Sequence, residues 1–414
     1  MSGADPSRPE TMTQAEARGI VECRFAPTIA TERAALAAAL NRVLAADLVA
    51  TVDLPPYDNA AVDGVAVRSV DLRTDTTTQL RLIGRAAAGH PHAGELARGQ
   101  AVRIFAGAPM PVGADLVIMQ ESCRIDGESV SILGGTAKNA YWRRRGDDVR
   151  AGSVLIPAGR RLHSQDIALA AALGNHQLTV FNRLNVALFS TGDEVRDPGT
   201  RLAIGEIWDA NRWLLRSLLG SLGCRVSDLG ILPDDALAIE AALTAAARDN
   251  DLLVTSGGVS VGSEDHLTAV IRRRGTLDVW RLAVSPGRPI GLGDIDACPI
   301  LALPGNTVPA IVMFVALGRS LVLRLAGARG EMPLSLRLPS NFALKKPAGR
   351  RDYLFGTVEN VGDGPSVVIP SARQGAGVLS AITETQGFIV LDENREAIRP
   401  DDVVEFTPLR SILG

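Results

Sequence analysis

Residues 252–265 read LLVTSGGVSVGSED, and along them the chain passes from strand to loop to helix. The apolar and β-branched run 252–255 predicts a buried strand, and a helical stretch begins at Glu264. The loop between them has three glycines and three serines. Without Cβ atoms, its backbone N–H groups can approach a phosphate closely, and the helix N-terminus adds positive potential. The loop is neither a Walker P-loop nor a dinucleotide-binding fingerprint. We therefore favour an anion-binding loop over a purely structural glycine turn.

The same strand–loop–helix pattern recurs on both sides of this stretch. Strands are predicted over 186–190, 225–229, 252–255 and 300–303, and helices over 211–222, 236–248, 264–274 and 308–325. Apolar strands that alternate with helices predict a parallel sheet with helices on both faces. We expect a central α/β domain at residues 183–328.

Three further domains complete the predicted α/β multidomain protein. Short Val/Ile runs between frequent Gly and Pro turns predict an inserted β-rich domain at residues 51–148. Helical stretches at 14–23, 32–49 and 164–173 predict a discontinuous helical N-terminal domain, residues 1–50 plus 149–182. Short strands after residue 329 predict a C-terminal β-barrel domain, residues 329–414.

Composition limits the classes of function. The formal net charge of −3 provides no general attraction to nucleic acid or to an anionic membrane. Four widely spaced cysteines argue against a zinc site and a disulfide framework; they are Cys23, Cys123, Cys224 and Cys298. The polar first 13 residues contain no apolar leader, and we expect no window near the ~20 apolar residues of a membrane span. We expect a cytoplasmic protein.

Polar residues follow three of the predicted strands, where open α/β sheets bind ligands. Thr191-Gly192 precedes Asp193 and Glu194; Ser256 opens the glycine loop; Pro304-Gly305-Asn306 precedes the last long helix. Each has an ordinary explanation as a turn or a helix cap, and Glu194 could equally position a metal or a water.

Two acidic segments precede the α/β region. Asp63 stands before a glycine, as a turn residue would, and Asp147 follows three arginines in what is commonly a solvated run of charges.

In this order, the segments resemble the molybdenum insertase family, which includes bacterial MoeA proteins and the E domain of gephyrin. The resemblance covers nearly the whole chain. Its stretches are LPPYDNAAVDGVAVR (54–68), AGAPMPVGADLVIMQE (106–121), RRRGDDV (143–149), STGDEV (190–195), GEIWDAN (205–211), TSGGVSVGSED (255–265), SPGRP (285–289), LPGN (303–306) and GRRDYLFG (349–356).

The resemblance implies an enzyme that inserts molybdate into adenylylated molybdopterin and releases AMP with the help of Mg²⁺. It also implies a homodimer in which the β domain of one subunit closes the pterin cleft of the other. Further partners would be the enzyme that adenylylates molybdopterin and the factors that mature molybdoenzymes.

The resemblance also implies the site residues. The acidic, catalytic set is Asp63, Asp147, Glu194, Asp234 and Asp265, of which Glu194, Asp63 and Asp265 would hold the metal. The pterin nucleotide and molybdate would be bound by Thr191, Gly192, Ser256, Gly257, Gly258, Ser260, Gly262, Pro304, Gly305, Asn306, Ser285, Arg288, Arg350 and Ser380.

Some positions depart from the family pattern. The turn that commonly reads KPGKP has Ser285 for its first lysine and Arg288 for its second, so one cation is lost from the predicted oxyanion site. Ala106 replaces a threonine, and Phe355 stands where arginine is frequent. Two positions after LPGN also differ. Where the family commonly has a proline and a serine, this chain has Thr307 and Pro309. Two alternatives to the enzyme therefore stay open: a pterin carrier that inserts no metal, and a gephyrin-like scaffold.

Overall fold

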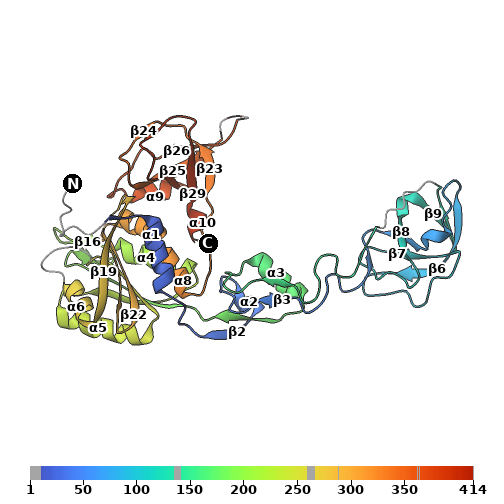
Figure 1. The fold of residues 1–414 in the computed structure, drawn as a ribbon, viewed down its shortest axis with the longest axis horizontal. Coiled ribbons are helices and arrows are strands. Elements are labelled where there is room, and N and C mark those ends of the chain that lie inside the picture. The colour runs from blue at the N-terminus through green and yellow to red at the C-terminus, as the bar shows by residue number, and fades with distance from the viewer. Residues whose placement is uncertain are drawn as a thin grey trace. The chain divides into compact units, whose positions relative to one another are not determined.

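The computed structural model describes residues 11–134, 141–258, 266–287, 289–360, 362 and 364–413 (Figure 1). The chain forms two compact units. The larger comprises Met1–Ala46, Ala158–His163 and Gln177–Gly414, and the smaller comprises Asp47–Pro157 and Ser164–His176. This division is coarser than the four predicted domains, whose bounds stay predictions.

A seven-stranded sheet forms the centre of the larger unit. Its order is β1 (Thr11–Met12), β19 (Gly275–Leu282), β21 (Pro289–Ile295), β22 (Cys298–Leu303), β18 (Leu252–Ser256), β14 (Asn185–Thr191) and β17 (Arg225–Leu232). The four predicted strands are β14, β17, β18 and β22, and they pair in parallel as expected. The prediction missed the other three strands, of which β21 runs antiparallel to both of its neighbours.

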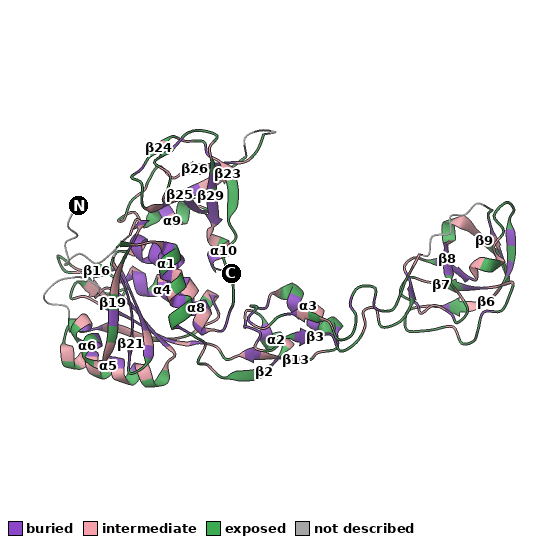
Figure 2. Cartoon of the chain, viewed as in Figure 1, coloured by how far each residue is buried: buried purple, intermediate pink, exposed green. Residues whose placement is uncertain are grey.

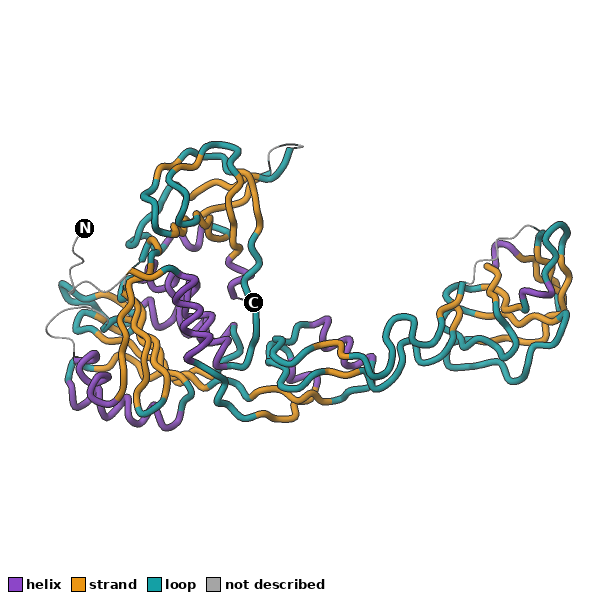
Figure 3. Tube along the Cα trace, viewed as in Figure 1, coloured by secondary structure: helices purple, strands orange, loops and turns teal. Residues whose placement is uncertain are grey.

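Helices cover both faces of this sheet (Figure 3). One face packs against α4 (Ala210–Ser221) and the apolar helix after β22; the other packs against α5 (Ala236–Asp249) and α6 (His266–Arg274). Successive side chains of β14 point to opposite faces of the sheet, as they do along any strand. Val186 and Leu188 join the first core, whereas Ala187 and Phe189 join the second. The predicted two-sided packing is confirmed.

The apolar helix consists of α7 (Thr307–Met313), a π-helical segment η3 (Phe314–Gly318) and α8 (Arg319–Leu325). Over Thr307–Leu325 it is long and apolar enough to cross a membrane, so the expectation that no such window exists was wrong. Of its most apolar window, 89% is buried inside the unit. A helix that packs on all sides is apolar on all sides, which explains its composition (Figure 2).

The predicted helical N-terminal domain is only partly helical. Helix α1 (Gln14–Arg24) forms as expected, and its buried Ala17 and Val21 belong to the core under the apolar helix. The predicted helix over 32–49 was wrong. The segment contains β2 (Thr31–Ala35), a four-residue α2 (Leu36–Ala39) and β3 (Leu48–Val49). β2 pairs with the distant β13 (Gln177–Phe181), and this tertiary pairing overrides the helical preference of an Ala- and Leu-rich stretch.

A second, six-stranded sheet lies in the C-terminal part of the larger unit. It contains β20 (Val284–Ser285), β25 (Arg351–Glu359), β27 (Gly387–Leu391), β29 (Val403–Pro408) and β23 (Leu336–Pro339), with β26 (Val367–Pro370) beside β25. β24 (Leu344–Lys345) pairs with β28 (Ala397–Ile398), and two short helices, α9 (Ser380–Glu384) and α10 (Leu409–Leu413), complete this part. Through β20, the SPGRP turn contributes a strand to this sheet.

The smaller unit is mainly β, as predicted for its central part. Its main sheet has the order β8 (Leu116–Met119), β5 (Gly64–Val67), β7 (Gln100–Ile104), β6 (Thr78–Ala86), β10 (Ser129–Ile132) and β9 (Cys123–Asp126). Two further pairs are β4 (Asn59–Ala60) with β11 (Trp142–Arg143), and β3 with β12 (Val154–Ile156). The short segments η1 (Ser69–Asp71) and η2 (Gln120–Ser122) and helix α3 (Ser164–Ala172) complete the unit. A hydrophobic core lies on each face of the main sheet.

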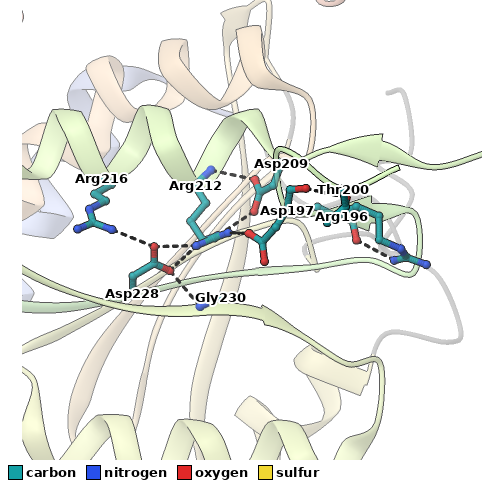
Figure 4. A network of polar contacts seen from close by, with 9 residues as sticks. Arg196, Asp197, Thr200, Asp209, Arg212, Arg216, Asp228 and Gly230 are labelled. Atoms are coloured by element: carbon teal, nitrogen blue, oxygen red, sulfur yellow. Dashed lines mark hydrogen bonds and ion pairs between the residues drawn. The ribbon is translucent and has the colours of Figure 1, made fainter. Parts of the chain in front are cut away.

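A buried arginine anchors the segment between β14 and α4, which contains β15 (Val195–Arg196) and β16 (Ile207–Trp208) (Figure 4). Arg212 is 5% exposed. Its Nε donates to Asp209 at 3.0 Å, and its Nη1 donates to both carboxylate oxygens of Asp228 at 2.7 Å. Its Nη2 pairs with Asp197 from the loop itself. One guanidinium therefore joins the loop, the first turn of α4 and strand β17.

These contacts change the acidity of Asp228. Burial by itself raises the pKa of this carboxyl, but hydrogen bonds from Arg212 and from the Gly230 N–H outweigh burial. The pKa therefore lies below the ordinary value of 3.8. Because the folded-state pKa is depressed, the stabilisation is present above the unfolded-state pKa and is lost as pH falls through the folded-state pKa.

We expect Arg212→Met to lower the free energy of unfolding by about 3–5 kcal/mol, since it leaves Asp209 and Asp228 without their countercharge. Urea unfolding followed by tryptophan fluorescence measures this loss. Arg216→Met is the matched control. Its guanidinium also contacts Asp228, but it is 49% exposed, so its removal should cost about 1 kcal/mol or less.

The same variant should respond less to acid. Below about pH 4, wild-type stability should fall more steeply than that of Arg212→Met, because the depressed pKa of Asp228 returns toward its ordinary value in the variant. Equal acid dependence in the two proteins would contradict the role given to this pair.

Candidate functional site

The polar loops after the parallel strands meet at one edge of the central sheet. Ser256, the last residue of β18, is paired with Ser190 of β14 on one side and with Leu303 of β22 on the other. On the far side of β14, Thr191 is paired with Leu232 of β17. The parallel register therefore brings the Thr191, Ser256 and Pro304 loops together, as the sequence predicted.

Gly257 and Gly258 are required by the way these loops pack. Both have positive φ, 98° and 71°. A Cβ atom on Gly257 would lie 3.0 Å from the Thr191 carbonyl oxygen, and one on Gly258 would lie 2.4 Å from Leu267 Cδ2. The Gly257 N–H donates to the Leu303 carbonyl at 3.0 Å. The fold alone thus accounts for these two glycines, and they also leave the loop free of side chains at this edge.

Asn211, in the first turn of α4, ties two of the loops together. Its Nδ2 donates to Ser256 Oγ and to the Gly305 carbonyl, both at 2.6 Å. Asn211 is 7% exposed, and its Oδ1 has no partner among the described residues. The sequence included this residue in a family-like stretch but gave it no role. Asn211 is the second residue after Asp209, the N-cap of α4, and no local sequence pattern marks an amide at this position as a connection between loops.

Two of the five predicted acidic residues lie near this edge. A Cβ atom on Gly192 would lie 2.7 Å from Glu194 Oε2, so the Glu194 carboxylate lies over the loop that follows β14. Glu194 is exposed. Asp234, also exposed, comes two residues after β17. Asp234 does not cap helix α5; the cap is the next residue, Asp235, whose carboxylate accepts from the Ala238 N–H at 2.8 Å.

Asp63 and Asp147 lie in the smaller unit, and both are exposed. Asp63 Oδ1 accepts from the Ala106 N–H at 2.9 Å, and Asp147 Oδ2 accepts from the Arg144 N–H at 2.6 Å. Asp147 therefore closes a local turn, which differs from the solvated run of charges considered for it, whereas Asp63 bonds to a segment 43 residues away rather than to its own turn. Their membership of one site with Glu194 stays a prediction.

The predicted molybdate residues are grouped around the C-terminal sheet. Ser285 of β20 is paired with Asp352 of β25, and Arg350 Nε donates to Asp352 Oδ1 at 3.0 Å. The structure thus brings Ser285, by strand pairing, and Arg350, by a side-chain hydrogen bond, to the same residue, Asp352. Ser380 begins α9, and its Oγ accepts from Arg373 Nη1 at 3.2 Å. Arg373 is therefore a cation beside the predicted Ser380, and the sequence analysis did not identify this arginine.

Four predicted residues, Ser260, Gly262, Asp265 and Arg288, lie outside the described residues. Within the described ranges, no group of three acidic, histidine or cysteine side chains could hold a metal ion. The predicted metal set includes Asp265 and therefore stays a prediction.

Burial raises the pKa of three cysteine thiols, to about 11 for Cys123 and about 12 for Cys224 and Cys298. These thiols are therefore protonated at neutral pH and poor metal ligands.

Family models match three successive parts of the chain. The MoeA N-terminal region (domain I and II) matches residues 12–174, a probable molybdopterin binding domain matches 187–324, and the MoeA C-terminal region (domain IV) matches 337–409. The second match contains Asn211 and the Thr191, Ser256 and Pro304 loops.

Individual relatives agree with these models. The molybdopterin molybdenumtransferase of Haemophilus influenzae is 36% identical over 98% of this chain and 100% of that protein. The protein of the same name from a Nostoc species is 32% identical over 87% of this chain and 85% of its own length. Among solved structures, the molybdopterin biosynthesis MoeA protein of Pyrococcus horikoshii has a TM-score of 0.81 at 26% identity, covering 96% of this chain and 100% of that one. From its sequence and its fold alike, the chain belongs to the MoeA family of molybdopterin molybdenumtransferases.

Proposed function

We propose that this protein is a molybdenum insertase, a transferase that places molybdate into adenylylated molybdopterin and releases AMP. The observation that carries the proposal is the meeting of the Thr191, Ser256 and Pro304 loops at the carboxyl edge of the sheet, with the Glu194 carboxylate over Gly192 in the first of these loops. Open α/β sheets bind their ligands at this edge, and glycines there leave room for phosphate oxygens.

Release of AMP requires cleavage of a phosphoanhydride. A water oxygen adds to one phosphorus and its proton passes to solvent, while the P–O bond to the bridging oxygen breaks and that oxygen leaves on the other phosphate with the bonding electron pair. We assign to Glu194 the task of orienting this water, since its carboxylate is exposed at the mouth of the site. The buried amide of Asn211 fixes the Ser256 and Gly305 loops, which would hold the phosphates.

Mg²⁺ fits the donors at this edge. Mg²⁺ prefers oxygen ligands and is commonly held by one or two carboxylates together with waters and substrate phosphates. Glu194 and Asp234 offer such carboxylates, and the family resemblance adds Asp63 and Asp265. When bound, the ion would offset the negative charge that develops on the leaving phosphate.

The carrier remains a second candidate because of one feature, Ser285, which removes a cation from the predicted molybdate pocket. We favour the enzyme because a carrier has no need of a carboxylate such as Glu194 above its phosphate loops, where it would repel the ligand. The contacts with the adenylylating enzyme and with maturation factors, and a cytoplasmic location, are part of the same proposal.

The first test separates the enzyme from the carrier. Glu194→Gln should abolish Mg²⁺- and molybdate-dependent AMP release while the pterin nucleotide still binds, because only the carboxylate charge is removed. Asp193→Asn is the matched control at the adjacent exposed carboxylate, and it should retain activity. If the wild type releases no AMP and Glu194→Gln changes nothing, the carrier takes the place of the enzyme.

The second test restores the missing cation. Two unit charges ~4 Å apart interact by about 4 kcal/mol at an effective dielectric near 20, and the cost of desolvation reduces this gain to about 1 kcal/mol. Ser285→Lys should therefore lower the molybdate concentration for half-maximal insertion by about fivefold. Ser285→Gln, which adds length without charge, should not. An unchanged or higher molybdate requirement would show that Ser285 lies outside the pocket or that the new ammonium pairs only with Asp352.

The third test concerns assembly. We propose a homodimer in which the β domain of one subunit completes the pterin cleft of the other, with Asp63 and Asp147 as its contribution. Sedimentation velocity at micromolar concentration should give twice the 43.6 kDa of the chain. A fully active monomer would refute this assembly.

A further inference from the structure

Two arginines face each other on the β sheet of the smaller unit. Arg85 of β6 and Arg103 of β7 are direct cross-strand partners. Both side chains are exposed, and both guanidinium groups lie over the ring of Phe105, at 4.8 and 5.2 Å from its centroid. The aromatic ring thus holds two cations side by side.

The charges of this pair are not balanced by the acids of the described chain. Four other arginines of the unit have carboxylate partners: Arg81 pairs with Glu128, Arg145 with Asp53, and Arg68 and Arg98 with Asp71. Within the described residues, no ion pair involves Arg85 or Arg103. Like charges directly opposite each other destabilise a sheet, so this arrangement costs the fold stability that a bound anion would restore.

One acid is bonded to the segment that directly follows Phe105. Directly after Phe105, the Ala106 N–H donates to Asp63 at 2.9 Å, and this bond fixes the turn that follows β7. Among the described residues Asp63 forms no ion pair with either guanidinium group, so it does not neutralise the two positive charges. The forked donors of two guanidinium groups match the oxygens of a tetrahedral oxyanion.

We propose that Arg85 and Arg103, supported by Phe105, form an oxyanion site that binds a phosphate group of the pterin nucleotide. The existence of the oxyanion site rests on the geometry of the pair alone. Its assignment to the nucleotide rests on the proposed function. Molybdate is also a tetrahedral oxyanion of similar chemistry, so the test must distinguish the two ligands.

The test is isothermal titration of the full-length protein, at low ionic strength, with inorganic pyrophosphate, AMP and molybdate as separate probes. Arg85→Gln and Arg103→Gln should each weaken binding of pyrophosphate and AMP about tenfold. Arg81→Gln is the matched control, since Arg81 lies on the same strand and is exposed but is paired with Glu128. Weakened binding of molybdate alone would refute the nucleotide and assign the oxyanion site to molybdate. Unchanged binding of all three probes would overturn the oxyanion site.

Thermal unfolding supplies a readout that a structural role would not produce. Without any anion, Arg103→Gln should melt at a higher temperature than the wild type, because the like-charge contact is gone. Pyrophosphate should raise the melting temperature of the wild type and of Arg81→Gln more than that of Arg103→Gln. If Arg103→Gln instead melts lower and binds pyrophosphate like the wild type, the pair stabilises the fold and binds no anion. These binding results do not depend on insertase activity, so they can fail or succeed separately from the proposed function.

Discussion

The hydrogen bonds from Asn211 Nδ2 to Ser256 Oγ and to the Gly305 carbonyl connect segments that are 45 and 94 residues away in the chain. They are buried, so breaking them would leave polar groups without water to replace the partner. The neighbouring residue, Arg212, adds a second connection from the same turn of α4 to the loop that follows β14. The start of one helix thereby fixes all three loops of the proposed site with respect to one another.

Position in the sheet determines what these loops can do. In the parallel register, three adjacent strands end at one edge, so their polar residues share a small volume although the sequence separates them. Gly192 leaves space there for the carboxylate of Glu194, because a side chain at Gly192 would occupy its place. Pre-arranged groups of this kind lower the cost of ordering a charged substrate when it binds.

Charge is distributed unevenly between the parts of the protein proposed to bind anions. Ser285 is uncharged where the family commonly has a lysine, and it is paired with Asp352, whose partner is Arg350. On the β sheet of the smaller unit, by contrast, Arg85 and Arg103 lie together without a described acid. A protein that binds anionic substrates while carrying a net charge of −3 must concentrate its cations locally, and this pair is such a concentration.

The sequence by itself determined the α/β order, because strand and helix periodicities are local properties. The strands over 186–190, 225–229, 252–255 and 300–303 all formed, and so did helix 14–23. Tertiary structure decided the rest. The segment 32–49 joined a strand from residues 177–181, a partner that no local pattern reveals. Residues 308–325 formed the predicted helix, but only the tertiary structure shows why it is so apolar, because 89% of its most apolar window is buried. Glu194, Ser256 and Gly305 could be named from motifs, but Asn211 could not, since its role exists only where three chain segments meet and exclude water.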